Sequence, residues 1–237
     1  MNRFLLAIDT TAGTSVALLA GEAVLAEVHF DSGMKHAELI GSAISQVMHQ
    51  ANAKPTQVTA VAVGRGPALF TGLRVGIAAG IMFSEACSSG LVGVVSHHAI
   101  AVQLYTENPE LLQKPLLVST DARRGEVYWC LYGGLDSAGV PIVLRGPSVE
   151  KHAHIVELLT DSYPDFNERT GGASAAWVGR LAQREILEGK RNTDVSAMYL
   201  RAPDAAEPKP NQFFAAAPEI SAAPDTAASH AISGSAK

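Results

Sequence analysis

A junction rich in glycine and proline constrains this chain more than any other segment. It runs from Gly64 to Gly76 with the sequence GRGPALFTGLRVG, follows an apolar strand-like run, and leads into a helical run. Glycine and proline at such a point indicate a special backbone path, so a strand is expected to turn sharply into a helix here. Two interpretations are open. The loop binds an anion at the helix N-terminus, or its glycines and Pro67 only shape the connection, with Thr71 as the helix cap.

Strand-like and helical runs follow one another in a definite order in the first half of the chain. The predicted strands are residues 4–8, 15–19, 23–30, 58–63 and 91–95, and the predicted helices are residues 35–51, 71–88 and 97–105. The first three strands have short connections and are therefore antiparallel neighbours. Strands joined through helices are expected to be parallel, so the sheet is mixed. This order is typical of one lobe of the actin-like ATPase fold (ribonuclease H-like), which also occurs in sugar kinases and heat-shock ATPases.

A second, shorter lobe is expected after residue 110. Its predicted strands are residues 116–120, 126–132 and 140–144, and its predicted helices are residues 148–159 and 174–188. Between residues 163 and 174 the pattern shows no convincing strand, which indicates a shortened lobe. After Pro203, alanine, proline, serine and charged residues dominate, as is typical of disorder. The predicted organisation is therefore an N-terminal lobe at 1–110, a reduced lobe at 111–205 and a disordered tail at 206–237.

Composition excludes several classes of function. The net charge is −5 with no basic block, so no broad footprint for nucleic acid is expected. The two cysteines, Cys87 and Cys130, lie far apart and suggest neither a metal site nor a disulfide framework. No apolar stretch of about eighteen residues occurs, and the apolar start at residues 1–8 is short, so we expect a strand there, no membrane span and a cytoplasmic protein.

The turn that follows the first strand is a candidate phosphate loop. It consists of Asp9, Thr10 and Thr11 and continues to Ser15, and in the actin-like fold such a turn cradles phosphate while its aspartate helps to hold a metal. This turn contains one glycine and no lysine or arginine, so a polar β-turn and a weak nucleotide site both remain possible.

Histidine spacing gives no metal site. His97 and His98 are adjacent and point about 100 degrees apart on a helix, whereas two helical metal ligands need a spacing such as i and i+4. We therefore expect no metal. No serine elbow, Walker loop or pair of catalytic carboxylates stands out either, so we expect no cofactor and no catalytic residue.

A row of small residues marks the second helix. Gly72, Gly76, Gly80 and Ser84 are four apart and share one side of the helix. Each interior glycine costs roughly 0.5–1 kcal/mol relative to alanine, so the row makes sense if another backbone comes close. The partner is either the helix at 35–51 of the same chain or a helix of another chain. In the second case, Gly76→Leu is expected to weaken association and leave the fold largely intact.

The motifs together resemble those of one family. The segment from Gly66 to Gly76 is similar to a Gly-Pro-Gly-Ser-Phe-Thr-Gly-Leu-Arg-x-Gly signature, and three further segments agree in the same order. These are Asp9-Thr10-Thr11, Asp121-Ala122-Arg123-Arg124-Gly125-Glu126-Val127-Tyr128 and Tyr199-Leu200-Arg201. They resemble the TsaB (YeaZ) family, the B subunit of the bacterial machinery for tRNA N6-threonylcarbamoyladenosine biosynthesis. The resemblance covers residues 5–204.

The resemblance implies a non-catalytic scaffold or dimerisation subunit. In that family the B subunit pairs with the D subunit, which carries the metal and transfers threonylcarbamoyl to tRNA. An E subunit with ATPase activity joins the assembly, the B subunit can also form a homodimer, and tRNA is reached only through the complex. The alternative is a weak actin-like ATPase or ATP-dependent phosphotransferase acting on its own.

The same resemblance places the partner interface on the first two helices. The expected interface residues are Leu39, Ala43, Val47, Gly72, Arg74, Gly76 and Gly80. One departure from the signature bears on the junction: Ala68-Leu69 replaces Gly-Ser, which removes a flexible residue and a hydroxyl and makes anion binding there less favourable.

Overall fold

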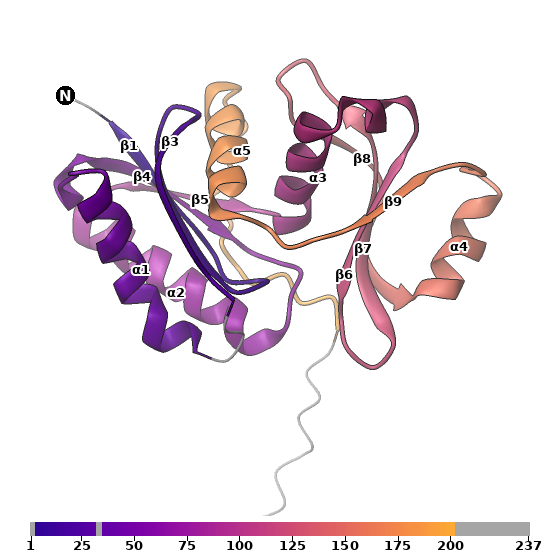
Figure 1. Ribbon diagram of the computed structural model, residues 1–237, viewed down its shortest axis with the longest axis horizontal. Coiled ribbons are helices and arrows are strands. Elements are labelled where there is room, and N and C mark those ends of the chain that lie inside the picture. Colours follow the sequence, from indigo (N-terminus) through magenta and orange to yellow (C-terminus); the bar gives the residue numbers. More distant parts are fainter. Residues whose placement is uncertain (1–2, 32–34, 202–237) are drawn as a thin grey trace, which may run out of the picture. The chain divides into compact units, whose positions relative to one another are not determined.

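The computed structural model describes residues 3–31 and 35–201 (Figure 1). The strands are β1 (Phe4–Asp9), β2 (Thr14–Ala20), β3 (Ala23–Phe30), β4 (Val58–Gly64), β5 (Gly90–Val94), β6 (Leu116–Asp121), β7 (Glu126–Leu135), β8 (Pro141–Lys151) and β9 (Asn167–Thr170). The α-helices are α1 (His36–Gln50), α2 (Phe70–Cys87), α3 (Ser96–Glu107), α4 (His152–Thr160) and α5 (Ala175–Leu187), with 3-10 helices η1 (Pro55–Gln57) and η2 (Pro109–Gln113).

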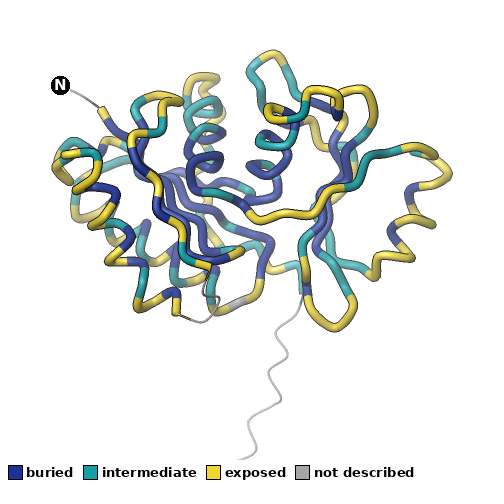
Figure 2. Tube along the Cα trace, in the orientation of Figure 1, coloured by how far each residue is buried: buried dark blue, intermediate teal, exposed yellow. Residues whose placement is uncertain are grey.

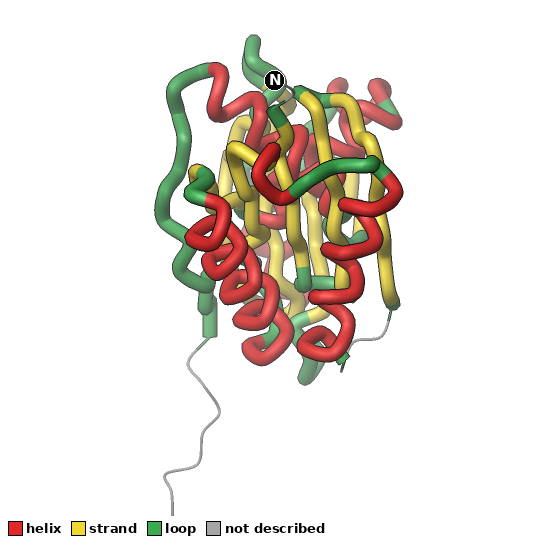
Figure 3. The backbone as a smooth tube through the Cα atoms, turned by 90° about the vertical axis from the view of Figure 1, so that its left-hand side faces the viewer, coloured by secondary structure: helices red, strands yellow, loops and turns green. Residues whose placement is uncertain are grey.

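The first sheet has the strand order β3-β2-β1-β4-β5. Strand β1 pairs antiparallel with β2 and parallel with β4, and β4 pairs parallel with β5. The predicted mixed sheet is therefore confirmed. Helices α1 and α2 pack on one face, against β2 and β3 and against β4 and β1 respectively. Figure 3 looks onto these two helices, which lie side by side in front of the strands.

The second sheet has the order β8-β7-β6-β9. Strand β9 pairs parallel with β6, so the expectation of no strand between residues 163 and 174 was wrong. Its sequence, NERT, is short and polar and lacks the apolar alternation that indicates a strand. The helix expected from residue 148 begins at His152, because residues 148–151 extend β8 along β7.

Helices α3 and α5 form a layer between the two sheets (Figure 1). One continuous apolar core joins both helices to β1 and β2 on one side and to β6 and β7 on the other, and Figure 2 shows the buried positions where they meet. The described residues belong to one compact unit, so the predicted lobe boundary at residue 110 stays a prediction. The predicted tail at 206–237 lies outside the described residues.

Two side chains of the first sheet fix the start of α5. The Ser174 hydroxyl and the Ala176 N–H donate to Glu27 Oε1 over 2.6 and 3.1 Å, and the Ala175 N–H donates to Ser15 Oγ over 2.9 Å. Backbone N–H groups in the first turn of a helix have no partner within the helix. The first sheet therefore caps a helix that follows the second sheet in the chain.

The junction turns sharply from β4 into α2, as its glycines predict. Gly66 has a φ of 98°, in the region that favours glycine, and its carbonyl accepts the Ser96 N–H over 2.9 Å. At Gly64 a side chain would collide with the Asp9 carboxylate. The predicted cap is wrong, because Leu69 occupies the N-cap position and no side chain caps the helix there, while Thr71 lies inside the first turn.

The glycine row on α2 faces the first sheet of the same chain. A Cβ at Gly72 would lie 2.8 Å from His36 Nε2 and 3.1 Å from the Thr10 carbonyl oxygen, a Cβ at Gly76 would collide with the Thr10 side chain, and a Cβ at Gly80 would collide with Val63. Close approach is therefore needed. At Gly72 it is partly to His36, which belongs to the helix predicted at 35–51. At Gly76 and Gly80 it is to Thr10 after β1 and to Val63 of β4, and neither contact was predicted from the sequence.

Two of the three α1 residues of the predicted interface have a similar outcome. Ala43 and Val47 are fully buried in the core against the sheet, and Leu39 is half-buried. Placing Ala43, Val47, Gly72, Gly76 and Gly80 in a partner interface is therefore corrected, because these residues are occupied by contacts within the chain. Arg74 is exposed on the outer side of α2.

Gly76→Ala is expected to lower the free energy of unfolding by roughly 1–3 kcal/mol, because the added methyl group collides with Thr10 in a packed interface. Gly76→Leu is then a fold-disrupting change and not an interface probe. The matched control is Gly41→Ala in α1, where a Cβ meets nothing within 4 Å, so alanine is expected to add about 0.5–1 kcal/mol. Urea unfolding of both variants measures the two changes in the free energy of unfolding, which are expected to have opposite signs. Equal changes would refute the close contact between Gly76 and Thr10.

Candidate functional site: a cleft at the strand ends

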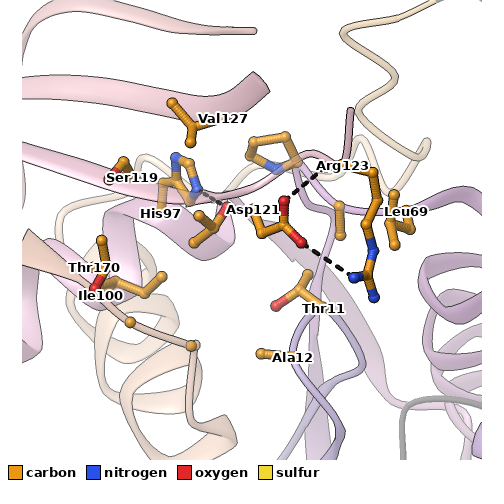
Figure 4. Close-up of a pocket in the computed structure, with 15 residues that line it drawn as sticks. Thr11, Ala12, Leu69, His97, Ile100, Ser119, Asp121, Arg123, Val127 and Thr170 are labelled. Atoms are coloured by element: carbon orange, nitrogen blue, oxygen red, sulfur yellow. Dashed lines mark hydrogen bonds and ion pairs between the residues drawn. The ribbon is translucent and has the colours of Figure 1, made fainter. Parts of the chain in front are cut away.

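A cleft of about 510 Å³ lies where the carboxyl ends of β1, β4, β6 and β9 converge (Figure 4). In open α/β sheets, ligands bind outside the carboxyl ends of parallel strands, so the cleft is the expected position of a ligand site in this fold. Its lining combines apolar side chains with hydroxyls and one pair of opposite charges. The lining residues are Thr11, Ala12, Pro67, Ala68, Leu69, His97, Ile100, Ser119, Thr120, Asp121, Arg123, Val127, Thr170, Gly171 and Gly172.

The candidate phosphate loop contributes little to this cleft. Asp9 is 1% exposed, and its carboxylate accepts hydrogen bonds from the Thr11 N–H (2.8 Å), the Thr11 hydroxyl (2.5 Å) and the Ser96 hydroxyl (2.7 Å). Thr10 is also buried and donates its hydroxyl to the Gly72 carbonyl over 2.9 Å. Of the three predicted residues, only Thr11 lines the cleft.

Burial sets the charge state of Asp9. Removal from water raises the pKa of its carboxyl group above the ordinary value of 3.8, and the hydrogen bonds from Thr11 and Ser96 act in the opposite direction. The carboxylate is thus a costly buried group that local donors satisfy. The Asp9 side chain connects β1 to the start of α3, so its observed role in this structure is to hold these two elements together.

Both histidines of α3 point into the protein. His97 Nε2 lies 2.8 Å from the Thr120 hydroxyl, and the His98 ring packs edge-on against Tyr132 with 5.7 Å between ring centroids. Burial lowers the pKa of His97 to about 3 and that of His98 to about 4, so both rings are neutral near pH 7. His97 therefore joins α3 to β6 at the wall of the cleft.

The β6–β7 turn carries the charges at the cleft. The Arg123 N–H donates to Asp121 Oδ1 over 2.8 Å and its guanidinium lies 3.4 Å from Asp121 Oδ2, with both side chains mostly exposed (Figure 4). The turn is therefore a hairpin between β6 and β7 whose charge pair is exposed to solvent. Arg123 and Arg124 have φ values of 65° and 59°, a conformation that non-glycine residues rarely adopt.

The segments that carried the family resemblance meet in space. The Tyr128 hydroxyl lies 3.5 Å from the Ala68 carbonyl oxygen, which joins β7 to the glycine-rich junction. Arg201 donates to the Ala122 carbonyl over 3.2 Å and forms an ion pair with Glu126. Tyr199 accepts a 2.6 Å hydrogen bond from Arg74 Nε. Sequence order alone did not reveal these contacts, because the partners are 60 to 125 residues apart.

Two kinds of feature are absent from the described residues. Residues 3–31 and 35–201 contain no group of three or more His, Cys, Asp or Glu side chains placed to hold a metal ion. Across the same part of the chain, no helix is long and apolar enough to cross a membrane.

Asp9→Asn is expected to unfold at the same free energy as the unchanged chain, or a higher one, at pH 7. It keeps an acceptor for Thr11 and removes a buried charge. Because the pKa is raised in the folded state, the cost of the carboxylate is present above that pKa and disappears as the pH falls toward 3.8. The advantage of Asn must therefore shrink on acidification.

Asp9→Ala is the matched control for this test. It leaves the Thr11 and Ser96 donors unsatisfied and is expected to lower the free energy of unfolding by about 1–3 kcal/mol at pH 7. The loss grows on acidification, because only the unchanged chain is then relieved of its buried charge. Urea titrations from pH 4 to 7 measure all three chains. A lower stability of Asp9→Asn at pH 7 that does not change with pH would contradict the assignment.

Comparison with known proteins agrees with this architecture. The family model described as TsaD, tRNA N6-adenosine threonylcarbamoyltransferase, matches residues 30–194, more than half of the 237 residues. The tRNA threonylcarbamoyladenosine biosynthesis protein TsaB of Escherichia coli (strain K12) is 33% identical over 130 residues, which is 54% of this chain and 54% of that protein. An uncharacterised protein of Mycobacterium leprae (strain TN) is 36% identical over 132 residues, which is 54% of this chain and 34% of that protein.

A solved structure matches over a greater length. YeaZ from Pseudomonas aeruginosa superposes with a TM-score of 0.70 at 22% identity and covers 84% of this chain and 100% of that one. This likeness confirms the predicted actin-like two-lobe fold. The matches to the two curated relatives span only 34% to 54% of their length. The chain therefore belongs to the family that the threonylcarbamoyltransferase model describes. Within that family it is a member of the TsaB (YeaZ) group.

Proposed function

We propose that the chain is a non-catalytic subunit that binds and supports the threonylcarbamoyl-transferring D subunit in tRNA threonylcarbamoyladenosine biosynthesis. The description of the matching family model names a transferase, and the E. coli relative is named a biosynthesis protein. Membership of the family supports a role in tRNA threonylcarbamoyladenosine biosynthesis. The character of α2 supports the role of a binding subunit.

The observation that carries this proposal is that α2 is apolar on both sides. Arg74 and Glu85 are the only charged residues among its 18. Its inner side buries Leu73 and Ile77, yet its outer side exposes Ala78 and leaves Met82 70% exposed. A helix that is hydrophobic all round is typically buried. The outer side of α2 is therefore a surface that a partner protein would cover.

Helix α1 extends this surface. It contacts α2, and its outer side exposes the small residues Gly41, Ser42 and Ser45 beside the half-buried Leu39. Small side chains permit a partner helix to approach closely. We therefore assign the partner-facing surface to Thr71, Arg74, Ala78 and Met82 of α2 together with the outer side of α1. Of the interface residues predicted from the sequence, this surface includes Arg74 and the exposed part of Leu39.

A non-catalytic role fits the use of the polar groups near the cleft. The Asp9 carboxylate is hydrogen-bonded to Thr11 and Ser96, and His97 is bonded to Thr120, so both groups already have structural partners. Under this proposal the D subunit supplies the chemistry, an E-type ATPase subunit joins the assembly, and tRNA is reached through the complex. A homodimer through the α1–α2 surface would compete with the D subunit.

Met82→Asp is expected to weaken binding to the D-type protein of the same organism at least tenfold, because it places a carboxylate in the centre of an apolar contact. The melting temperature should change little, since the side chain is 70% exposed. Titration calorimetry or biolayer interferometry with the purified partner measures the affinity.

The matched control is Leu187→Asp at the end of α5, a comparably exposed apolar residue (74%) away from α2. It is expected to bind like the unchanged chain. The proposal fails if the unchanged chain forms no complex at micromolar concentrations. The assignment of the surface fails if both variants bind equally.

A further inference from the structure

Two segments singled out in the sequence have no role in the function proposed so far. They are the Asp121–Tyr128 segment and the Tyr199-Leu200-Arg201 segment. In the structure they meet at the end of an extended stretch, residues 191–201, which contains no helix or strand and is called the strap below. Because no ladder or helix holds the strap, its course depends on individual contacts.

The strap is held at four successive places. Arg191 donates to the Leu91 carbonyl, and the Asn192 carbonyl accepts the Gly93 N–H over 2.9 Å, so the strap begins along the edge strand β5. Asp194 forms a 2.7 Å ion pair with Arg65 of the glycine-rich junction, whose carbonyl also accepts the Met198 N–H over 2.7 Å. The last two places are α2 and the β6–β7 turn.

At α2 the strap fixes the direction of an arginine. Arg74 Nε donates to the Tyr199 hydroxyl over 2.6 Å, and the guanidinium lies 5.4 Å from the centroid of the Tyr199 ring. Arg74 is the one cation on the outer side of α2, within the proposed partner-facing surface. A long arginine side chain held in one direction loses less entropy when a partner binds it.

At the β6–β7 turn the strap is anchored two residues later. Arg201 donates to the Ala122 carbonyl and pairs with Glu126, and the two charged side chains are only 20% and 31% exposed. Partial burial means that salt screens this pair less than it screens a fully exposed ion pair. Tyr199 thus lies between the Met198 anchor on Arg65 and the Arg201 anchor on Glu126.

We propose that Arg201 and Glu126 are positioning residues for the partner-facing surface. Their ion pair pulls the end of the strap onto the β6–β7 turn, which keeps the Tyr199 hydroxyl against Arg74 and presets that guanidinium for the partner. The expected effect on partner binding rests on the proposed function, whereas the contact between Tyr199 and Arg74 can be measured without the partner.

The test reverses the ion pair. Glu126→Arg and Arg201→Glu each place like charges together, free the end of the strap and are expected to weaken binding of the D-type protein roughly three- to tenfold. The double variant restores opposite charges but not the donor to the Ala122 carbonyl, so it is expected to recover most, and not all, of the lost affinity. A merely structural loss would not be restored by exchanging the charges. Tyr199→Phe, which removes only the acceptor hydroxyl, is expected to weaken binding to a similar degree.

Lys114→Glu provides the matched charge control. Lys114 pairs with Asp165 over 2.6 Å and precedes β6, so it lies at the opposite end of that strand from the turn that holds Arg201. This variant makes the same change in side-chain charge as Arg201→Glu and is expected to leave both the affinity and the Arg74 signal unchanged.

A partner-free measurement separates the two proposals. The side-chain Nε–H signal of Arg74 in ¹H–¹⁵N NMR spectra should exchange slowly with water in the unchanged chain, faster in either single variant, and slowly again in the double variant. If the unchanged chain does not bind the D-type protein but this signal behaves as expected, the proposed function falls and the positioning role stands. If the folded single variants keep a slowly exchanging signal, or the double variant fails to recover it, the positioning role is overturned.

Discussion

One buried carboxylate holds the centre of this structure together. Asp9 ends β1, fills the space that the absent side chain of Gly64 leaves at the end of β4, and accepts a hydrogen bond from Ser96 at the start of α3. Ser96 in turn donates its N–H to the Gly66 carbonyl. The ends of β1 and β4 and the start of α3 thereby meet at one side chain. Burial of a charge is costly, and the donors from Thr11 and Ser96 offset that cost.

The direction of α2 follows from this arrangement. Because the junction is fixed by Gly64 and Gly66, α2 starts close to the sheet, and its glycine row lies against Thr10 and Val63. The side of α2 that carries the glycine row is therefore in contact with the sheet of the same chain. What remains outward is Arg74, Ala78 and Met82 on an otherwise apolar helix. The same constraint that builds the core therefore also leaves an uncovered apolar surface.

The periodic features of the fold could be predicted from the sequence, and the contacts between them could not. Alternation and the 3.6-residue period gave the order of elements in the first sheet, because each pattern reports one buried face. The same periodicity cannot say what covers that face. The family resemblance placed Ala43 and Val47 in a partner interface, and the structure buries both in the core. Spacing showed that Gly76 needs a close neighbour and could not show that the neighbour is Thr10. Strand β9 was not predicted, because its four residues are polar and it pairs with β6, which is distant in the sequence.

The cleft and the α2 surface differ in what their residues are free to do. Around the cleft, Asp9 and His97 are engaged by neighbouring side chains, and Asp121 is paired with Arg123, so its ionisable groups serve the fold and the hairpin. On α2 the apolar outer side has no such use within the described residues, and the strap holds Arg74 in place through Tyr199. The Asp121–Tyr128 and Tyr199–Arg201 segments, which look like separate motifs in the sequence, act on one surface once Arg201 meets Glu126. A subunit whose role is to bind a partner through a preorganised surface does not need catalytic groups of its own. The proposed binding role therefore agrees with the observation that these charged groups make contacts within the chain.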